Sequence, residues 1–300
     1  MIFQTTGRVV DGFYVLGTNA VPSYLLDGLC PALFDAGMTF LGKFYENSAR
    51  RVLGERLPRY LFVTHAHFDH LGAAAHLARS FPGLKIAMST RAAQILERPG
   101  AIETICRLNE QAGDWGRRHG ATGLLDEPFE PFEPGLVLQD GDEVDLPGGL
   151  TVRALATPGH TRDFLSYYIP KKKILVSSEA SGCPDMTGYV FSEFLVDYDA
   201  YVESIKRLKA LDVEVVCPGH YQVFTGEDAR DLFGRSLRAA EEFRARVEEL
   251  LDEEGGDIER VIERVRVVEY DPKPHPKQPE PAYLINTRAR IEHLAARRTR

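Results

Sequence analysis

Cysteine is scarce in this chain of 300 residues, and its four cysteines lie far apart. They are Cys30, Cys106, Cys183 and Cys217, and no two of them form a CxxC pair. This spacing is more typical of reduced thiols in a cytosolic protein than of a disulfide framework or a thiolate zinc site. We therefore expect a cytoplasmic protein that is stabilised by an ordinary buried core.

Long apolar runs and an excess of positive charge are also missing. No segment reaches the roughly 18 apolar residues that a membrane span requires, and the N-terminus has no basic flank followed by a long apolar run. The chain carries 36 Lys and Arg against 44 Asp and Glu, a net charge of −8, which argues against a general binder of phosphate backbones. We expect neither a membrane nor a nucleic acid as a partner. A homodimer is one oligomeric state that the sequence allows.

Short apolar runs in the first 90 residues alternate between strand and helix patterns. Three of them end in glycine ("GFYVLG", "SYLLDG" and "ALFDAG") and are typical of a meander of antiparallel strands. Residues 60–65 ("YLFVTH") predict a strand, residues 71–81 a helix, and residues 84–90 a further strand. This alternation favours the α/β fold class.

The remaining sequence predicts an insert, a second block of strands and a helical end. We expect one catalytic domain over residues 1–225, with a helical insert at about 90–120 that is broken near Pro99. Residues 226–300 should form a C-terminal helical extension that covers the site. In its basic last stretch we expect solvated side chains that suit the helix dipole, namely Arg288, Arg290, Arg297, Arg298 and Arg300.

Four apolar strands each end on a histidine or a glutamate. The segments "LFVTH", "RALATPGH", "ILVSSE" and "EVVCPGH" end near His65, His160, Glu179 and His220. In layered α/β folds, functional groups gather outside the strand ends, so these four segments predict a single convergent site. The Pro-Gly pair before His160 and His220 favours a tight turn that lifts the imidazole away from the strand.

The most specific pattern is "HAHFDH", which places three histidines and an aspartate within six residues. His65 and His67 can share one side of an extended segment, so they suit one metal ion. Asp69 and His70 project differently and could serve a second ion. Nitrogen and oxygen ligands without thiolate suit Zn²⁺, Fe²⁺ or Mn²⁺. We expect two divalent transition-metal ions, with zinc as the first choice and iron or manganese as alternatives.

The ordered set of HxHxDH, "TPGHT", an acidic residue after a buried strand and a late "PGH" resembles the metallo-β-lactamase superfamily over residues 10–225. The resemblance implies an αββα sandwich with a two-metal site at one edge of the sheets. It also implies that one metal is held by His65, His67 and His160, and the other by Asp69, His70 and His220.

Glu179 departs from the pattern of that superfamily. It stands where the family has a bridging aspartate, usually in a Gly-Asp pair, whereas this chain has Ser178-Glu179. Three consequences of the longer side chain are open. The backbone shifts to accommodate it, or Glu179 binds only one metal, or the second metal is weakly bound. We expect Glu179 to be a direct ligand, and the alternative is a carboxylate that holds a ligand histidine.

These residues predict a metal-dependent hydrolase that attacks a carbonyl with a metal-bound hydroxide, with Asp69 orienting the water or shuttling its proton. The helical insert and the C-terminal helices should wall a cleft for a small-molecule acyl substrate. A thioester or an ester is the first choice, followed by a lactone and then a phosphodiester. A metal-binding regulatory protein without turnover is the alternative from another functional class, and the altered Ser178-Glu179 pair keeps it open.

Some weaker signals complete the sequence-based picture. A fainter resemblance to the quinolone-signal-response thioesterase branch rests on "VPSYLL", "RLNEQ", "YVESIKRL" and the helical C-terminal extension. Tyr221 could donate to the substrate or be an ordinary buried tyrosine. Among the other histidines we expect His76 to serve packing or to support a ligand. We expect His119, His275 and His293 to be solvated.

Overall fold

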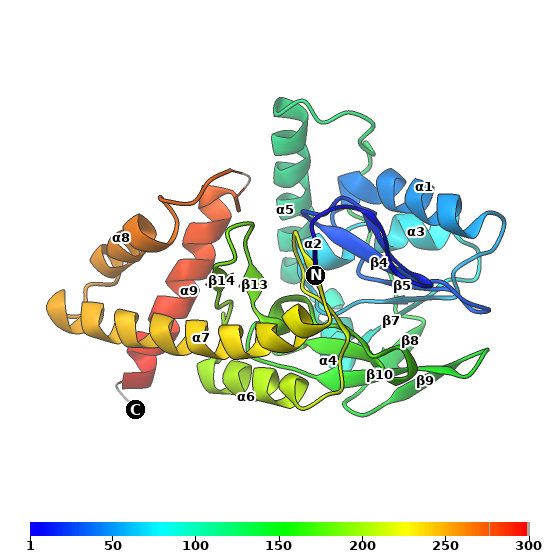
Figure 1. Ribbon diagram of the computed structural model, residues 1–300. Coiled ribbons are helices and arrows are strands. Elements are labelled where there is room, and N and C mark those ends of the chain that lie inside the picture. The colour runs from blue at the N-terminus through cyan, green and yellow to red at the C-terminus, as the bar shows by residue number, and fades with distance from the viewer. Residues whose placement is uncertain (276, 299–300) are drawn as a thin grey trace.

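Two seven-stranded sheets form the centre of the molecule, with helices on their outer faces (Figure 1). The computed structural model describes residues 1–275 and 277–298. Apolar side chains from both sheets, such as Phe34 and Phe62 of one and Tyr167 and Val176 of the other, pack into one buried cluster. The arrangement is the αββα sandwich that the sequence predicted.

The first sheet carries the N-terminal half of the chain. Its strands follow the order β2 (Gly7–Val10), β3 (Phe13–Gly17), β4 (Pro22–Leu26), β5 (Ala32–Phe34), β6 (Tyr60–Phe62), β7 (Lys85–Ser89) and β8 (Leu136–Leu138). The pairs from β2 to β5 are antiparallel, as the glycine-punctuated runs predicted, and the pairs from β5 to β8 are parallel. The parallel strands send their C-terminal ends to one edge.

The second sheet pairs the start of the chain with residues 223–225. Its order is β1 (Ile2–Phe3), β16 (Val223–Thr225), β15 (Val215–Cys217), β12 (Ile174–Val176), β11 (Leu165–Ile169), β10 (Leu150–Ala156) and β9 (Glu143–Leu146). Within it β12 and β15 are parallel neighbours, and the other pairs are antiparallel. A small hairpin of β13 (Cys183–Pro184) and β14 (Val190–Phe191) stands apart.

Helices cover both outer faces of the sandwich. Against the first sheet lie α1 (Gly42–Leu53) and α3 (Ala74–Ser80), which share an apolar cluster with its strands. Against the second lie α6 (Tyr198–Lys209) and α7 (Glu227–Glu253). The short elements are α2 (Phe68–Leu71) and the 3₁₀ turns η1 (Thr39–Leu41), η2 (Pro170–Lys172) and η3 (Ser178–Ser181).

The expected break in the helical insert is confirmed. Helix α4 (Thr90–Leu96) ends before Pro99, and α5 (Pro99–Arg118) begins with that proline at its first turn, where a missing N–H costs nothing. Asn109 of α5 accepts a hydrogen bond from the Thr39 N–H at 2.9 Å and so fixes α5 against η1. No helix within the described residues is long and apolar enough to cross a bilayer.

The C-terminal helices form a layer at the opposite end of the molecule from α1 and α3 (Figure 1). They are α7, α8 (Ile258–Glu269) and α9 (Glu280–Arg298). Solvation of the whole basic stretch was a wrong prediction, although its last residue, Arg300, lies outside the described residues. Arg290 is fully buried and pairs with the buried Glu269 at 2.8 Å. The solvated state predicted for His293 was also wrong, because its Nε2 accepts a hydrogen bond from the Tyr198 N–H at 3.0 Å.

Candidate metal centre

The predicted ligands come together at the edge where strands of both sheets end. His65 and His67 follow β6 of the first sheet, and the one-turn helix α2 carries Asp69 and His70. His160 follows β10, Glu179 lies in η3 after β12, and His220 follows β15 of the second sheet. The expectation of one site built from four chain segments therefore describes the arrangement of these side chains.

Three imidazoles form the first cluster. One ring nitrogen from each of His65, His67 and His160 lies within 4.8 Å of the others. His160 Nε2 is 3.2 Å from His67 Nδ1, and the rings of His65 and His160 meet edge to face with centroids 5.1 Å apart. Three nitrogens converging at this spacing suit one transition-metal ion.

The second cluster contains Asp69, His70 and His220, whose ligand atoms also lie within 4.8 Å of one another. Asp69 Oδ2 is 3.8 Å from both His70 Nε2 and His220 Nε2. The Asp69 side chain keeps 18% of its surface exposed, so it is open to a bound substrate or water. The two clusters match the division into two metal sites that the family resemblance implies.

Glu179 lies between the two clusters. Its Oε1 is 3.1 Å from His70 Nε2 and 3.0 Å from His220 Nε2, while its Oε2 is 3.8 Å from His65 Nε2. The side chain is only 4% exposed. Its two oxygens thus face different clusters, as a bridging carboxylate requires, with the closer approach to the second cluster.

The extra methylene of Glu179 finds room beside Gly219. A Cβ atom at position 219 would overlap the Glu179 carboxylate, so the glycine of "CPGH" provides the space. Ser178 adopts a left-handed conformation (φ 46°), which explains why a glycine suits this position, and its hydroxyl donates to Glu179 Oε2 at 2.8 Å. The longer side chain is therefore accommodated by its neighbours.

Backbone carbonyls orient two of the histidines. His160 Nδ1 lies 2.6 Å from the carbonyl oxygen of Glu193, and His220 Nδ1 lies 2.8 Å from that of Ala20. A carbonyl oxygen only accepts, so Nδ1 carries the proton in both rings and Nε2 is left with its lone pair. Ligand histidines in metalloproteins are held in this way.

Asp35 performs the same task for His70. Its Oδ2 lies 3.0 Å from His70 Nδ1, and its carboxylate also accepts hydrogen bonds from the Thr64 N–H and hydroxyl. Thr64 in turn lies beside His65, with Thr64 Oγ1 3.0 Å from His65 Nδ1. One buried carboxylate thus holds both ends of the segment that runs from Thr64 to His70.

An unpartnered nitrogen supports metal binding. His65 Nε2 is fully buried, and within the described residues no group makes a hydrogen bond to it. A buried polar atom without a partner costs about 1–3 kcal/mol unless a ligand satisfies it. The donors around it are nitrogens and carboxylate oxygens, so they fit zinc, iron or manganese.

The protonation of the histidines follows their surroundings. Burial lowers the pKa of His65 well below its ordinary value, and burial lowers that of His160 to about 3. Burial also disfavours charge on His70 and His220, but the surrounding carboxylates together outweigh it and raise the pKa of both, with Glu179 the largest contributor among them. For Glu179 itself the penalty of burial is outweighed by His70 and His220, which hold its pKa well below the usual range.

The sequence-based reasoning missed three residues that support the site. Asp35 and Glu193 contact ligand histidines, and Asp163 Oδ2 accepts a hydrogen bond from the Ala66 N–H at 2.7 Å, between the first two ligands. Asp35 had a detectable signal, since it is a lone carboxylate at the end of the apolar run "ALF". Glu193 acts through its backbone, which no residue pattern reveals.

The other histidines lie outside the two clusters. His76 Nε2 is 3.1 Å from Glu46 Oε2, His119 Nδ1 is 2.8 Å from the Trp115 carbonyl oxygen, and His275 is exposed. Tyr221 has a left-handed backbone (φ 62°) and donates its N–H to the Asn19 carbonyl. Its hydroxyl role stays a prediction.

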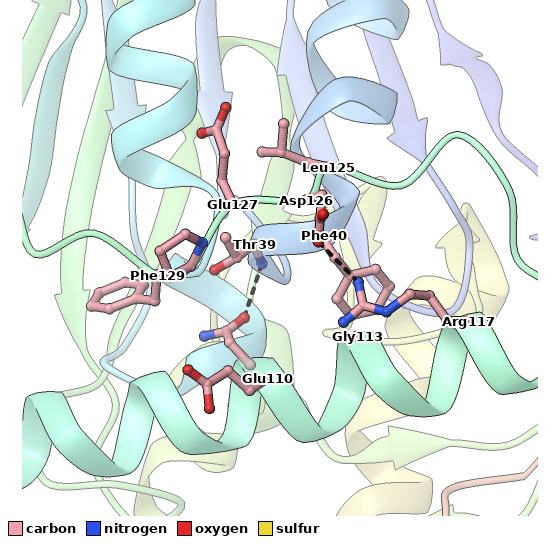
Figure 2. Close-up of a pocket in the computed structure, with 11 residues that line it drawn as sticks. Thr39, Phe40, Glu110, Gly113, Arg117, Leu125, Asp126, Glu127 and Phe129 are labelled. Carbon is pink, nitrogen blue, oxygen red and sulfur yellow. Dashed lines mark hydrogen bonds and ion pairs between the residues drawn. The ribbon is translucent and has the colours of Figure 1, made fainter.

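A cavity of about 170 Å³ lies between α5 and residues 125–129 (Figure 2). Thr39, Phe40 and Arg117 are among its lining residues, and none of the predicted metal ligands is. The cavity is therefore separate from the metal centre. The helical insert nevertheless contacts the region of the predicted ligands, because α5 packs against α2, which carries Asp69 and His70.

Comparison with known proteins points to one family. A model described as the metallo-beta-lactamase superfamily matches residues 16–220, which include all the predicted ligands. The chain is 23% identical over 207 residues to an atrochrysone carboxyl ACP thioesterase from Aspergillus fumigatus, a match that covers 69% of this chain and 49% of that protein. It is 29% identical over 166 residues to a hydroxyacylglutathione hydrolase from Rhodopseudomonas palustris, covering 54% and 48%.

The chain thus spans about half the length of these two curated relatives. Among solved structures, a metallo-beta-lactamase family protein from Thermus thermophilus superposes with a TM-score of 0.65 at 20% identity, covering 97% of this chain and 95% of that one. This likeness confirms the fold, including the helices that follow the sandwich. The narrower resemblance to the quinolone-signal-response branch stays a prediction.

Proposed function

This chain belongs to the metallo-beta-lactamase superfamily and carries its metal-binding pattern, and from this we propose that it is a metal-dependent hydrolase that cleaves a thioester or ester carbonyl. The observation that carries the proposal is the convergence of seven predicted ligand side chains from four segments, among them the buried His65 with its unpartnered Nε2. The names of two relatives, a thioesterase and a hydroxyacylglutathione hydrolase, favour the thioester among acyl substrates.

The chain would hold two divalent ions, zinc first, in its two clusters. His65, His67 and His160 would hold one, and Asp69, His70 and His220 the other, with Glu179 between them. Ions bound there would supply Lewis acidity and lower the pKa of water toward neutrality. The imidazoles of His160 and His220 are already fixed in the tautomer that binds metal, so these two rings require little reorganisation.

Asp69 would be the catalytic residue of the chain. It lies at the partly open side of the second cluster, whereas Glu179 is enclosed. One carboxylate oxygen can bind metal while the other accepts a proton from the attacking water and later gives it to the leaving group. A leaving thiolate requires less assistance from a proton than an alkoxide does, which again suits a thioester.

Metal analysis combined with a substrate panel tests the proposal. The protein, purified without chelator, should contain one to two transition-metal ions per chain and should hydrolyse a generic acyl thioester faster than a lactone or a phosphodiester. The chelated protein should lose this activity and regain it with zinc, iron or manganese. A metal-loaded protein that turns over none of the three classes would instead support a regulatory role without catalysis. Absence of metal after reconstitution would refute the site itself.

A further inference from the structure

The segment between β14 and α6 has no regular secondary structure, and its position depends on contacts with other parts of the chain. The N–H groups of Val196 and Asp197 both donate to the carbonyl of Gly159, at 3.1 and 3.2 Å. Gly159 directly precedes the ligand His160. These two bonds attach the end of the segment to the "PGH" turn.

Glu193 is the centre of this segment. Its carbonyl accepts the bond from His160 Nδ1 at 2.6 Å, and its N–H points at the Tyr201 hydroxyl oxygen at 3.3 Å. Its side chain contacts helix α9, where Oε2 accepts a hydrogen bond from Asn286 Nδ2 at 2.9 Å. The side chain and backbone of one buried residue thus connect helix α9 to a predicted metal ligand.

A second residue of α9 holds the same segment. Arg290, one helical turn after Asn286, donates to the carbonyl of Ser192 at 3.3 Å. Arg290 is itself fixed by Glu269 at 2.8 Å, and Glu269 also accepts hydrogen bonds from the Tyr189 and Tyr283 hydroxyls. Helix α9 therefore holds residues 192–193 at two points, through Asn286 and Arg290.

Tyr201 extends the connection to the second part of the site. Its hydroxyl donates to the carbonyl of Glu179 at 3.3 Å while it accepts the N–H of Glu193. Displacing Glu193 would therefore disturb the backbone of Glu179 as well, but only through one additional bond. The direct contact is the one with His160.

From these contacts we propose that Asn286 is a positioning residue for the metal centre, acting through Glu193 to hold the imidazole of His160. The proposal rests on the metal site of the proposed function. The C-terminal helices would then contribute to the affinity of the first cluster for its ion, although they supply no ligand. Partners that hold ligand histidines change metal affinity by roughly 10–100-fold when removed. Asn286 acts one residue further away, so about 10-fold, the lower end of that range, is expected.

The test compares Asn286→Ala with Ile285→Ala in the full-length protein. Ile285 is the preceding residue, 64% exposed, and controls for a change in helix propensity. Histidine ring ¹⁵N NMR of the metal-free protein reports the tautomer of His160, and a zinc titration followed by the same signals gives the affinity of each cluster. Asn286→Ala should weaken the affinity of the cluster of His65, His67 and His160 about 10-fold and shift the His160 signal. The affinity of the cluster of Asp69, His70 and His220 should change less, because only the indirect contact through Tyr201 reaches it.

Asn286→Gln retains an amide donor and should recover part of the affinity, which loss of general stability would not explain. If Asn286→Ala does not fold, Asn286→Gln replaces it in the same measurements. Wild-type affinity and an unshifted His160 signal in both variants would overturn the proposal. If the wild type takes up no zinc, the proposed function fails. The His160 signal of the metal-free protein still decides whether Asn286 positions the ring.

Discussion

Asp35 Oδ2 lies 3.0 Å from Nδ1 of His70, and both side chains are buried. The contact fixes the tautomer in which His70 Nε2 faces Asp69, His220 and Glu179. Asp35 tolerates the left-handed backbone (φ 54°) that this position requires, a conformation that aspartate and asparagine adopt more readily than most residues.

Asp35→Asn should therefore keep the fold but weaken metal binding at the second cluster by roughly 10–100-fold. Asparagine suits the backbone, yet it replaces a charged acceptor of the His70 N–H with a neutral one. Zinc titration of the variant measures the effect. Asp212→Asn is the control, because Asp212 is 70% exposed and pairs with Lys173 on the surface. Equal affinities in the two variants would show that Asp35 does not set the orientation of His70.

The sequence predicts the residues of the site, but it does not predict how the strands pair within the two sheets. The apolar runs that lead to His65, His160, Glu179 and His220 are visible in the sequence, because apolar runs and metal-binding residue types are both local patterns. Register and sheet order are not, because β1 pairs with β16 across more than 200 residues. The expected strand over residues 60–65 also ends at Phe62, which frees the following residues to turn toward the site.

Arg290 shows why residue type alone misled the sequence-based prediction for the basic tail. Its neighbours Arg288 and Arg297 do pair at the surface, with Glu259 and Asp199. Arg290 instead shares the inward face of α9 with Tyr283, Thr287 and Ile291, which are all buried. Arg290 lies three residues after Thr287 and four before Leu294, both of which are buried, and this helical spacing is the signal that it lies on the buried face of α9.

Arg290→Met should destabilise the fold by about 3–5 kcal/mol, because it leaves the buried Glu269 carboxylate without its cation. The tyrosine hydroxyls that also bond Glu269 cannot replace that charge. Arg288→Met is the matched control on the same helix, where an exposed pair contributes about 0–1 kcal/mol. Urea denaturation of both variants gives the two free energies of unfolding. Similar values would mean that the buried pair contributes no more than the exposed one.

Asp69→Asn should retain the fold and lose most of the hydrolytic activity. The substitution removes a ligand charge and the proton acceptor together, and loss of a positioned acid-base group alone costs about 10²–10⁴-fold. The side chain lies at the partly exposed side of the site, so no buried core is disturbed. Steady-state kinetics on the acyl substrate found by the panel, at saturating zinc, measures kcat. Asp114→Asn on the exposed face of α5 is the control. A wild-type rate in Asp69→Asn would remove Asp69 from the mechanism.

Glu179 provides the sharpest test of the two-metal arrangement. Its carboxylate faces His70 and His220 through Oε1 and His65 through Oε2, so its removal takes a negative charge from between two cations. Glu179→Ala should therefore lose the ion of the second cluster first, with a drop in affinity at or above the upper part of the roughly 10–100-fold range for residues that only support a ligand.

Glu179→Asp should retain two ions but bind them less tightly than the wild type. Aspartate withdraws the carboxylate by one methylene from the space beside Gly219 that the longer side chain fills. The double variant Glu179→Asp, Ser178→Gly restores the Gly-Asp pair of the family and relieves the left-handed serine, so it should recover affinity. Zinc titration of all four proteins, with unfolding measured in parallel, gives the comparison. Equal two-metal affinity throughout would show that Glu179 is not a ligand. Asp185 could not then take its place, because its side chain already accepts hydrogen bonds from its own turn and pairs with Lys273 at 3.2 Å.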